Sequence, residues 1–439
     1  MEAKSPRGTS DILPGVTEIW RHIEKTVSDV MRAFGYREIR TPVFEHTELF
    51  ERGVGETTDI VEKQMYTFED RGGRSITLRP EGTAPVVRAF VQHRLYGRGL
   101  PQKLWYVQPM FRYERPQAGR ARQFHQFGAE ALGSLDPACD VEMIAIPLEV
   151  YRRLGIERYQ VLLNSIGCPR CRPAYRDALR AYLGQRLDQL CATCRSRYER
   201  NPMRILDCKS EGCRRAAAGA PASLDYLCSE CRDHFAAVRQ LLDALEIGYT
   251  VDTRLVRGLD YYTKTVFEVV TDALGAQDTL AAGGRYDGLV EELGGPPTPA
   301  VGFGAGMERA VLALERAGKA VVESDRIDAY VVSLGEEARR AAVSLAWRLR
   351  QRGVAVAYDY RDPAGGERSL RAQMKAAGKA GAPWVVIVGD GELARSAVAI
   401  KRMADGAQWE VPLSEAPERV VRELGGEGER APQPEASSR

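Results

Sequence analysis

Apolar residues recur at helical spacing over residues 16–34, and Gly35 ends the pattern. This spacing predicts an amphipathic helix that buries one face. Residues 36–45 predict a strand, and Pro42 is expected at its end or at an exposed edge, because proline cannot donate to a ladder. Further strands are predicted over 75–80, 103–114, 123–133 and 159–167, and a helix is predicted over 137–155.

The two long strands, 103–114 and 123–133, flank a turn that is rich in arginine, glycine and proline. Strands separated by such a turn are predicted to pair as a hairpin. Residues 249–271 predict strand structure that is interrupted once, and the glycine-rich segment 281–295 follows.

From about Asp325 the pattern changes to strands that alternate with helices. This alternation predicts a parallel or mixed sheet and therefore a separate α/β domain. Residues 426–439 contain too few apolar side chains to fold and are predicted to be disordered. The strands of the α/β domain are predicted over 328–335, 354–360 and 383–392, and its helices over 336–352 and 367–380.

Charge is nearly balanced over the 439 residues, with a formal net charge of +2. A surface for nucleic acid must therefore come from local asymmetry. Residues 339–402 carry thirteen Lys and Arg against five Asp and Glu. Such an excess is typical of a phosphate-binding surface or of a solvated helix face. The polar N-terminus and the lack of a membrane-length apolar run predict a cytoplasmic protein without a membrane segment.

Arginines gather with carboxylates and phenols in segments that lie far apart along the chain. Their positions near glycines and turns favour contact with a ligand, although a structural ion pair is the alternative for any single one. The sequence contains no GxxxxGK[ST] loop and no strand-leading GxGxxG, which argues against a P-loop or a dinucleotide site. The set suits a polyanion together with an amino acid, and it comprises Arg79, Glu81 and Thr83; Arg112, Gln126 and Glu130; Arg257, Tyr261 and Tyr262; residues 283–287; and residues 307–309.

Several of these segments together resemble the histidyl-tRNA synthetases, which are class II aminoacyl-tRNA synthetases. "YREIRTP", "FRYERPQAGRARQFHQFGAE" and "GFGAGMER" look like motifs 1, 2 and 3, while "RGLDYYT" and "GGRYDGL" are similar to the two segments that mark the histidine enzymes. The resemblance implies an α+β fold, in which an antiparallel sheet with flanking helices dimerises through motif 1. It also implies a catalytic domain over 1–325, a Cys-rich insertion over about 168–235 and an α/β anticodon-binding domain over 326–425.

The resemblance further implies ligation of L-histidine to tRNA(His) through a histidyl-adenylate, with ATP and Mg²⁺. Arg112 and Arg257 would be catalytic, and Arg112, Arg120, Arg257 and Arg309 would bind ATP. Glu130 would face the ammonium of histidine, and Tyr262 and Tyr286 would contact the imidazole. The histidine site would comprise Glu81, Gly82, Thr83, Gln126, Glu130, Tyr261, Tyr262 and Tyr286, and the tRNA contacts would be Gln117, Arg122 and Arg395.

Eight of the nine cysteines form four closely spaced pairs. Pairs of this kind suit two tetrahedral zinc sites made of thiolates, and the alternative is a helical insertion with reduced, partly buried thiols. The pairs are Cys168 and Cys171, Cys191 and Cys194, Cys208 and Cys213, and Cys228 and Cys231.

Two other functions compete with the synthetase interpretation. A non-catalytic regulatory paralogue of ATP phosphoribosyltransferase resembles the same core, but it typically lacks the anticodon-binding domain and several charged substrate residues. A zinc-dependent nucleic-acid module would account for the cysteines and would leave the arginine clusters unexplained.

Overall fold

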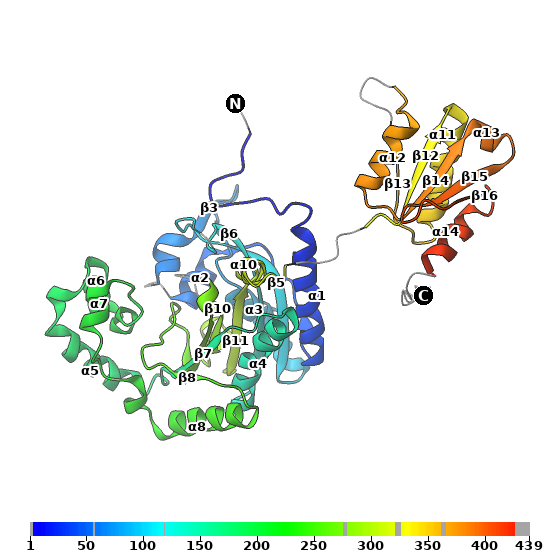
Figure 1. Ribbon diagram of the computed structural model, residues 1–439. Coiled ribbons are helices and arrows are strands. Elements are labelled where there is room, and N and C mark those ends of the chain that lie inside the picture. Colours follow the sequence, from blue (N-terminus) through cyan, green and yellow to red (C-terminus); the bar gives the residue numbers. More distant parts are fainter. Residues whose placement is uncertain are drawn as a thin grey trace. The chain divides into compact units, whose positions relative to one another are not determined.

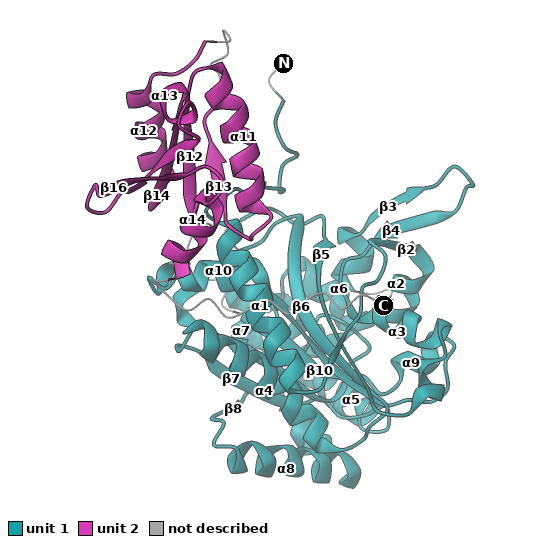
Figure 2. Cartoon of the chain, turned by 90° about the vertical axis from the view of Figure 1, so that its right-hand side faces the viewer, with its two compact units in different colours: residues 1–322 teal, residues 323–439 magenta. Residues whose placement is uncertain are grey.

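The computed structural model describes residues 3–55, 58–117, 119–274, 279–320, 326–360 and 366–425. The chain divides into two compact units, residues 1–322 and 323–439 (Figure 2). The tail that was predicted to be disordered, 426–439, lies outside the described residues.

An eight-stranded sheet forms the centre of the first unit, in the order β1-β5-β6-β11-β10-β9-β7-β8 (Figure 1). Its inner strands pair antiparallel, whereas β1 on β5 and β8 on β7 are parallel. The antiparallel-rich sheet predicted for the catalytic core is therefore confirmed. The strands are β1 (Arg37–Glu38), β5 (Gln102–Phe111), β6 (Gln123–Leu132), β7 (Gln160–Ser165), β8 (Thr250–Val251), β9 (Thr263–Val270), β10 (Thr279–Arg285) and β11 (Ala300–Gly306).

The predicted hairpin is confirmed, because β5 and β6 pair from Gln102 with Leu132 to Phe111 with Gln123. Two other strand predictions were wrong in part. Residues 36–45 form two short strands, β1 and β2 (Phe44–His46), with no regular structure around Pro42, which has no amide hydrogen to donate. Residues 252–262 form a loop between β8 and β9, so that segment is much less regular than its strand-like composition suggested.

Three helices pack on one face of the large sheet: α1 (Thr17–Ala33), α4 (Pro137–Leu154) and α10 (Met307–Arg316). They share a core with every second residue of β6, including Phe127 and Ala129. Because side chains alternate along a strand, Gln126, Gly128 and Glu130 face the other way.

Smaller elements complete the core of the first unit beside the large sheet. A three-stranded antiparallel sheet of order β2-β4-β3 pairs β4 with both of its neighbours. The elements are α2 (Thr47–Val54), the π-helix η1 (Ile60–Gln64), β3 (Tyr66–Glu69), β4 (Ser75–Leu78), α3 (Thr83–Gln92), η2 (Leu95–Arg98), η6 (Asp272–Leu274) and α9 (Leu289–Glu292).

A helical insertion joins β7 to β8 and carries the eight paired cysteines. Its helices are α5 (Arg172–Gly184), η3 (Leu187–Gln189), α6 (Ala192–Arg200), η4 (Pro202–Ile205), α7 (Glu211–Ala216), η5 (Ser223–Tyr226) and α8 (Ser229–Ala244).

The second unit contains a five-stranded sheet in the order β13-β12-β14-β15-β16. β12 pairs parallel with β13 and β14, while β15 and β16 add antiparallel, which agrees with the predicted mixed sheet. No helix within the described ranges has the length and apolar character needed to cross a bilayer. The elements are β12 (Ala329–Leu334), α11 (Glu336–Arg350), β13 (Val356–Tyr358), α12 (Leu370–Lys379), β14 (Trp384–Gly389), α13 (Asp390–Leu393), β15 (Ala397–Arg402), β16 (Gln408–Pro412) and α14 (Ala416–Gly425).

Candidate active site

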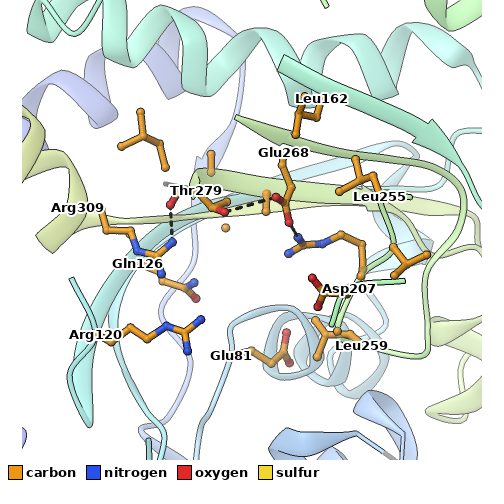
Figure 3. A pocket seen from close by; sticks show the side chains of 18 of the residues that line it. Glu81, Arg120, Gln126, Leu162, Asp207, Leu255, Leu259, Glu268, Thr279 and Arg309 are labelled. Atoms are coloured by element: carbon orange, nitrogen blue, oxygen red, sulfur yellow. Dashed lines mark hydrogen bonds and ion pairs between the residues drawn. The ribbon is translucent and has the colours of Figure 1, made fainter. Parts of the chain in front are cut away.

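A cavity of about 760 Å³ opens in the first unit, and segments far apart in the sequence form its wall. Strands β5, β6, β9 and β11 contribute residues to it, as do the loop 252–262 and the insertion. Figure 3 shows Arg120, Gln126 and Arg309 reaching in from one side and Glu81, Asp207 and Glu268 from the other. Arginines and carboxylates from distant segments therefore line one space.

All four arginines predicted to bind ATP line this cavity: Arg112, Arg120, Arg257 and Arg309. Arg112 follows β5 and donates a 2.8 Å hydrogen bond from Nε to the carbonyl oxygen of Pro80. Arg120 lies in the turn between β5 and β6, where it forms a 3.1 Å ion pair with Glu114. Backbone and carboxylate contacts thus hold these two guanidinium groups in place.

Arg257, in the loop 252–262, and Arg309, in the first turn of α10, also line the cavity. Arg257 forms an ion pair with Glu268 of β9. Burial opposes the charged form of Arg257, but Glu268 and, among its other neighbours, Asp207 raise its pKa. Arg309 begins α10 and donates to the carbonyl oxygens of Thr279 and Gly119. Burial lowers the pKa of Arg309, and the positive charges of neighbouring arginines act in the same direction. A polyanion in the cavity would relieve that repulsion.

Glu81 and Thr83 lie where the chain enters α3, and both line the cavity. The Glu81 carboxylate accepts hydrogen bonds from the backbone amides of Thr83 (2.9 Å) and Ala84 (2.7 Å). The hydroxyl of Tyr261 also donates to it, at 3.4 Å. Burial raises the pKa of Glu81. Gly82, Gln126, Tyr261 and Tyr262 also line the cavity.

Glu130 and Tyr286 do not line the cavity but lie one layer deeper. Glu130 is fully buried and accepts hydrogen bonds from the hydroxyls of Thr83 (2.8 Å), Tyr106 (3.2 Å) and Tyr286. Burial raises the pKa of Glu130 to about 8, although the three hydroxyls oppose the shift. Thr83 and Tyr106 line the cavity and connect Glu130 to it.

Other candidate residues lie outside the cavity lining. Arg122 stacks on Tyr113, with its guanidinium carbon 3.9 Å from the ring centroid, and Gln117 forms a backbone bridge with Arg120. Arg395 belongs to the second unit and pairs with Glu410 at 3.1 Å. Arg79 is 2% exposed and donates to the carbonyl oxygens of Thr41, Pro42 and Pro109, so it supports the fold here.

Comparison with known proteins connects this arrangement to one family. A family model described as Histidyl-tRNA synthetase matches residues 8–310, and one described as Anticodon binding domain matches residues 328–423. The chain belongs to the histidyl-tRNA synthetase family. The family resemblance noted from the sequence motifs is confirmed.

Relatives in this family match almost the whole chain. The histidine–tRNA ligase of Halothermothrix orenii is 53% identical over 414 residues, which cover 94% of this chain and 98% of that protein. The histidine–tRNA ligase of Moorella thermoacetica is 55% identical over 414 residues, covering 94% and 97%. A crystal structure of apo S. aureus histidyl-tRNA synthetase matches with a TM-score of 0.79 at 39% identity, covering 95% of this chain and all of that one (100%).

Among the cavity-lining residues that the motif analysis did not name are Tyr106, Glu114, Asp207 and Glu268. Glu268 had a detectable signal, because it is a charged residue within the otherwise apolar strand sequence "TVFEVV". Glu114 lies within the motif 2 segment itself, whereas Tyr106 and Asp207 had no such signal, since their importance comes from the partners that folding brings to them.

The cysteines of this synthetase form two separate clusters. Cys168, Cys171, Cys228 and Cys231 make the first, and Cys191, Cys194, Cys208 and Cys213 make the second. Within each cluster the four sulfur atoms lie within 4.8 Å of one another. The outer pairs of the insertion thus meet each other, and so do the inner pairs.

Proposed function

We propose that this chain joins L-histidine to tRNA(His) through a histidyl-adenylate, using ATP as its family does. The observation that carries the proposal is that the four arginines expected to bind ATP line one cavity together with carboxylates, an amide and phenols. The arginines carry the charge that would bind the triphosphate of ATP. The carboxylates would bind the ammonium of histidine, and the amide and phenols could form hydrogen bonds with it.

In the first step the carboxylate of histidine attacks the α-phosphorus of ATP, and pyrophosphate leaves. Negative charge is redistributed over the phosphate oxygens, so fixed cations stabilise the transition state. We assign the catalytic roles to Arg112 and Arg257, and assign Arg120 and Arg309 to the phosphates with them. The hydrogen bonds and ion pairs of these side chains support this, since preorganised groups need little rearrangement during reaction. Bound together with ATP, Mg²⁺ would add positive charge at the phosphates.

Histidine recognition is assigned to Glu81, Thr83, Gln126 and the tyrosines of the same cavity. Because Glu81 lines the cavity and Glu130 does not, we propose that Glu81 meets the ammonium, together with Thr83 and Gln126. The imidazole lies against Tyr261 and Tyr262. Beneath it, the hydroxyls of Thr83, Tyr106 and Tyr286 donate hydrogen bonds to the Glu130 carboxylate. Gly82 leaves room for Tyr106, whose ring carbon would be 2.4 Å from a Cβ at that position. A side chain without matching polar atoms leaves these groups unpaired, which supplies specificity.

Recognition of tRNA is assigned to both units. Gln117 and Arg122 lie on the turn beside the cavity and are proposed to meet the acceptor end, including the additional guanosine that the family usually reads. Arg395 is proposed to contribute to the anticodon-binding surface of residues 326–425. The first unit, 1–322, supports a catalytic domain over residues 1–325 that contains the insertion.

The two cysteine clusters are proposed to bind one structural Zn²⁺ each. A tetrahedral site with Zn–S bonds of about 2.3 Å places its sulfurs about 3.8 Å apart. The separations of Cys168 from Cys171 (3.7 Å) and Cys228 (3.9 Å), and of Cys191 from Cys208 (4.0 Å), fit that geometry. The backbone amide of Cys194 lowers the pKa of Cys191 to about 7, whereas burial raises the pKa of Cys194 and of Cys208.

We also propose that the chain forms a homodimer through motif 1. Strand β1 supports this, because it is short and lies at one edge of the eight-stranded sheet, and α1 precedes it. Sedimentation equilibrium of the full chain tests the proposal, which a monomer at micromolar concentration would contradict.

The competing function is that of the regulatory paralogue. A structure described as an ATP phosphoribosyltransferase regulatory subunit/histidyl-tRNA synthetase matches at 25% identity with a TM-score of 0.62. The presence of Arg112, Arg120, Arg257 and Arg309 in the cavity and the match of residues 328–423 to an anticodon-binding model favour the synthetase. Histidine-dependent ATP–pyrophosphate exchange, followed by charging of tRNA(His) with labelled histidine, tests the proposal. Absence of both activities in folded protein would refute it.

A further inference from the structure

The second cysteine cluster lies close to the candidate active site in a way that the first does not. Cys208 lines the active-site cavity, and so do its neighbours Asp207 and Lys209. None of the four cysteines of the first cluster lines that cavity. Cys194 and Cys208 bound the chain segment 195–207, so a metal ion held by both would close this segment into a loop.

Residues of this closed segment hold the backbone loop that carries Arg257. Arg204 donates a 2.9 Å hydrogen bond from Nη1 to the carbonyl oxygen of Gly258. Asn201 donates a 3.0 Å hydrogen bond from Nδ2 to Oδ1 of Asp260. Gly258 directly follows Arg257, so both contacts restrain the residues from which the guanidinium enters the cavity.

The same segment is fixed to the core on its other side. Arg204 is 8% exposed, and its Nη2 lies 3.1 Å from Asp59. Arg197 also pairs with Asp59, and Arg200 pairs with Glu62 of η1. Arg204 therefore bridges the core and the Arg257 loop with one planar group, which a lysine could reproduce only in part.

Asp207 completes the connection at the cavity wall. It lies between the buried segment 202–206 and the metal-ligand candidate Cys208, and Figure 3 places it on the same side of the cavity as Glu268. Glu268 is the ion-pair partner of Arg257. Two carboxylates, one from β9 and one from the insertion, thus lie on the side of the cavity where that pair forms.

We propose that a metal ion bound by Cys191, Cys194, Cys208 and Cys213 positions Arg257 for adenylate formation, acting through Asn201, Arg204 and Asp207 of the segment it closes. The inference rests on the proposed reaction and on the proposed zinc sites. Metal binding and local folding are coupled in such sites, so loss of the ion loosens the segment and with it the Arg257 loop. Asn201, Arg204 and Asp207 are positioning residues and do not act on the substrate themselves.

The test compares Cys213→Ser, Arg204→Ala and Arg204→Lys with wild type, all as full-length protein. Cys213 is buried and does not line the cavity, so its replacement acts through the metal site. Cys213→Ser should reduce bound zinc from two ions per chain to one. A displacement of catalytic groups by 1 Å can cost about 10²-fold, so we expect a decrease in kcat of histidine-dependent pyrophosphate exchange of roughly 10- to 100-fold. Arg204→Ala should lower kcat about tenfold with both ions retained, and Arg204→Lys should restore part of the loss.

The decisive measurement repeats Cys213→Ser and Arg204→Ala in an Arg257→Ala background. If both act through Arg257, neither lowers kcat further there; losses that multiply would overturn the inference. Arg215→Ala is the matched control, because Arg215 lies in the same part of the insertion and is 72% exposed, and Glu211 is its one ion-pair partner among the described residues. It should match wild type in kcat and metal content, and a tenfold loss would also count against the inference.

The outcomes distinguish failure of this inference from failure of the proposed reaction or of the proposed zinc sites. Wild-type protein without histidine-dependent exchange would refute the proposed reaction, and wild-type protein without bound metal would refute the proposed zinc sites. Two bound ions in wild type, one in Cys213→Ser and an unchanged kcat would refute only the positioning of Arg257.

Discussion

The hydroxyl of Thr83 donates a 2.8 Å hydrogen bond to the carboxylate of Glu130, and this bond joins the lining of the cavity to the layer beneath it. Thr83 begins α3, whereas Glu130 lies on β6, so the contact also joins two elements that surround the proposed histidine site. Glu130 is completely buried, and electrostatic interactions are strong in such a low-dielectric environment. A change in its charge therefore alters the electrostatic potential at the residues that line the cavity.

The raised pKa of Glu130 predicts how stability depends on pH. Its pKa is about 8 in the folded state against an ordinary value of 4.5, so the folded state holds a proton that the unfolded state releases. The contribution to stability is full below pH 4.5 and is lost as pH rises through 8. Glu130→Gln should remove this component, which is measured as the difference in Tm between the two proteins from pH 5 to 9. Parallel Tm profiles for the two proteins would contradict the prediction.

Histidine binding should release protons from the same carboxyl group. The negative charge of Glu81 contributes to the raised pKa of Glu130, and an ammonium beside Glu81 offsets that charge and lowers the pKa. Calorimetry at pH 7 in buffers of different ionisation enthalpy should therefore detect net proton release in wild type and less in Glu130→Gln. Equal proton release in both would assign it to another group.

Gly302→Ala should displace the Glu130 carboxylate and disrupt its hydrogen bonds with Thr83, Tyr106 and Tyr286. A Cβ at Gly302 would lie 1.7 Å from Oε2 of Glu130 and 2.7 Å from the carbonyl oxygen of Ala129, in the middle of the sheet. Overpacking of this kind costs about 1–3 kcal/mol, so we expect a lower Tm and a raised KM for histidine. Gly248→Ala is the control, since among the described residues, its two chain neighbours apart, no atom lies within 4 Å of a Cβ built there. An unchanged Tm in Gly302→Ala would show that Glu130 can move without cost.

Arg257→Ala should slow adenylate formation without unfolding the chain. Loss of one preorganised donor costs about 3–4 kcal/mol, or roughly 10²- to 10³-fold in kcat of pyrophosphate exchange. Arg257→Lys should restore little, because a point charge cannot reproduce the planar fork that faces Glu268. Arg158→Ala, which removes an exposed surface pair with Asp272, is the control. Wild-type exchange by folded Arg257→Ala would remove the catalytic role.

Arg395 and Glu410 should affect tRNA binding in opposite directions. The two form an exposed pair at 3.1 Å, and if Arg395 contacts a phosphate, Glu410 competes for it. Arg395→Ala should weaken binding and lower the slope of log Kd against log salt by about 1, whereas Glu410→Ala should strengthen binding. Fluorescence titration with tRNA(His) across salt concentrations checks this, and identical slopes would remove Arg395 from the interface.

Local patterns were reliable where short-range physics decides the structure. The β5 and β6 hairpin followed from two apolar strands around a polar turn, and the helices α1 and α4 followed from their apolar spacing. The loop 252–262 was misjudged because its apolar residues, among them Leu255 and Val256, are buried in a loop. Apolar residues that are buried in an irregular loop recur at no fixed spacing, so their sequence pattern does not distinguish them from a strand.

By itself the sequence determined the family, the antiparallel-rich core, the mixed sheet of the second unit and the set of arginines that line one cavity. It did not determine the depth of Glu130, the pairing of the four cysteine pairs into two clusters, or the nearness of Asp207 to the Arg257 loop. Those features depend on distances between residues that are tens of positions apart. Strand and helix periods show which side of an element a residue occupies, but only the packing of elements against one another shows what it meets there.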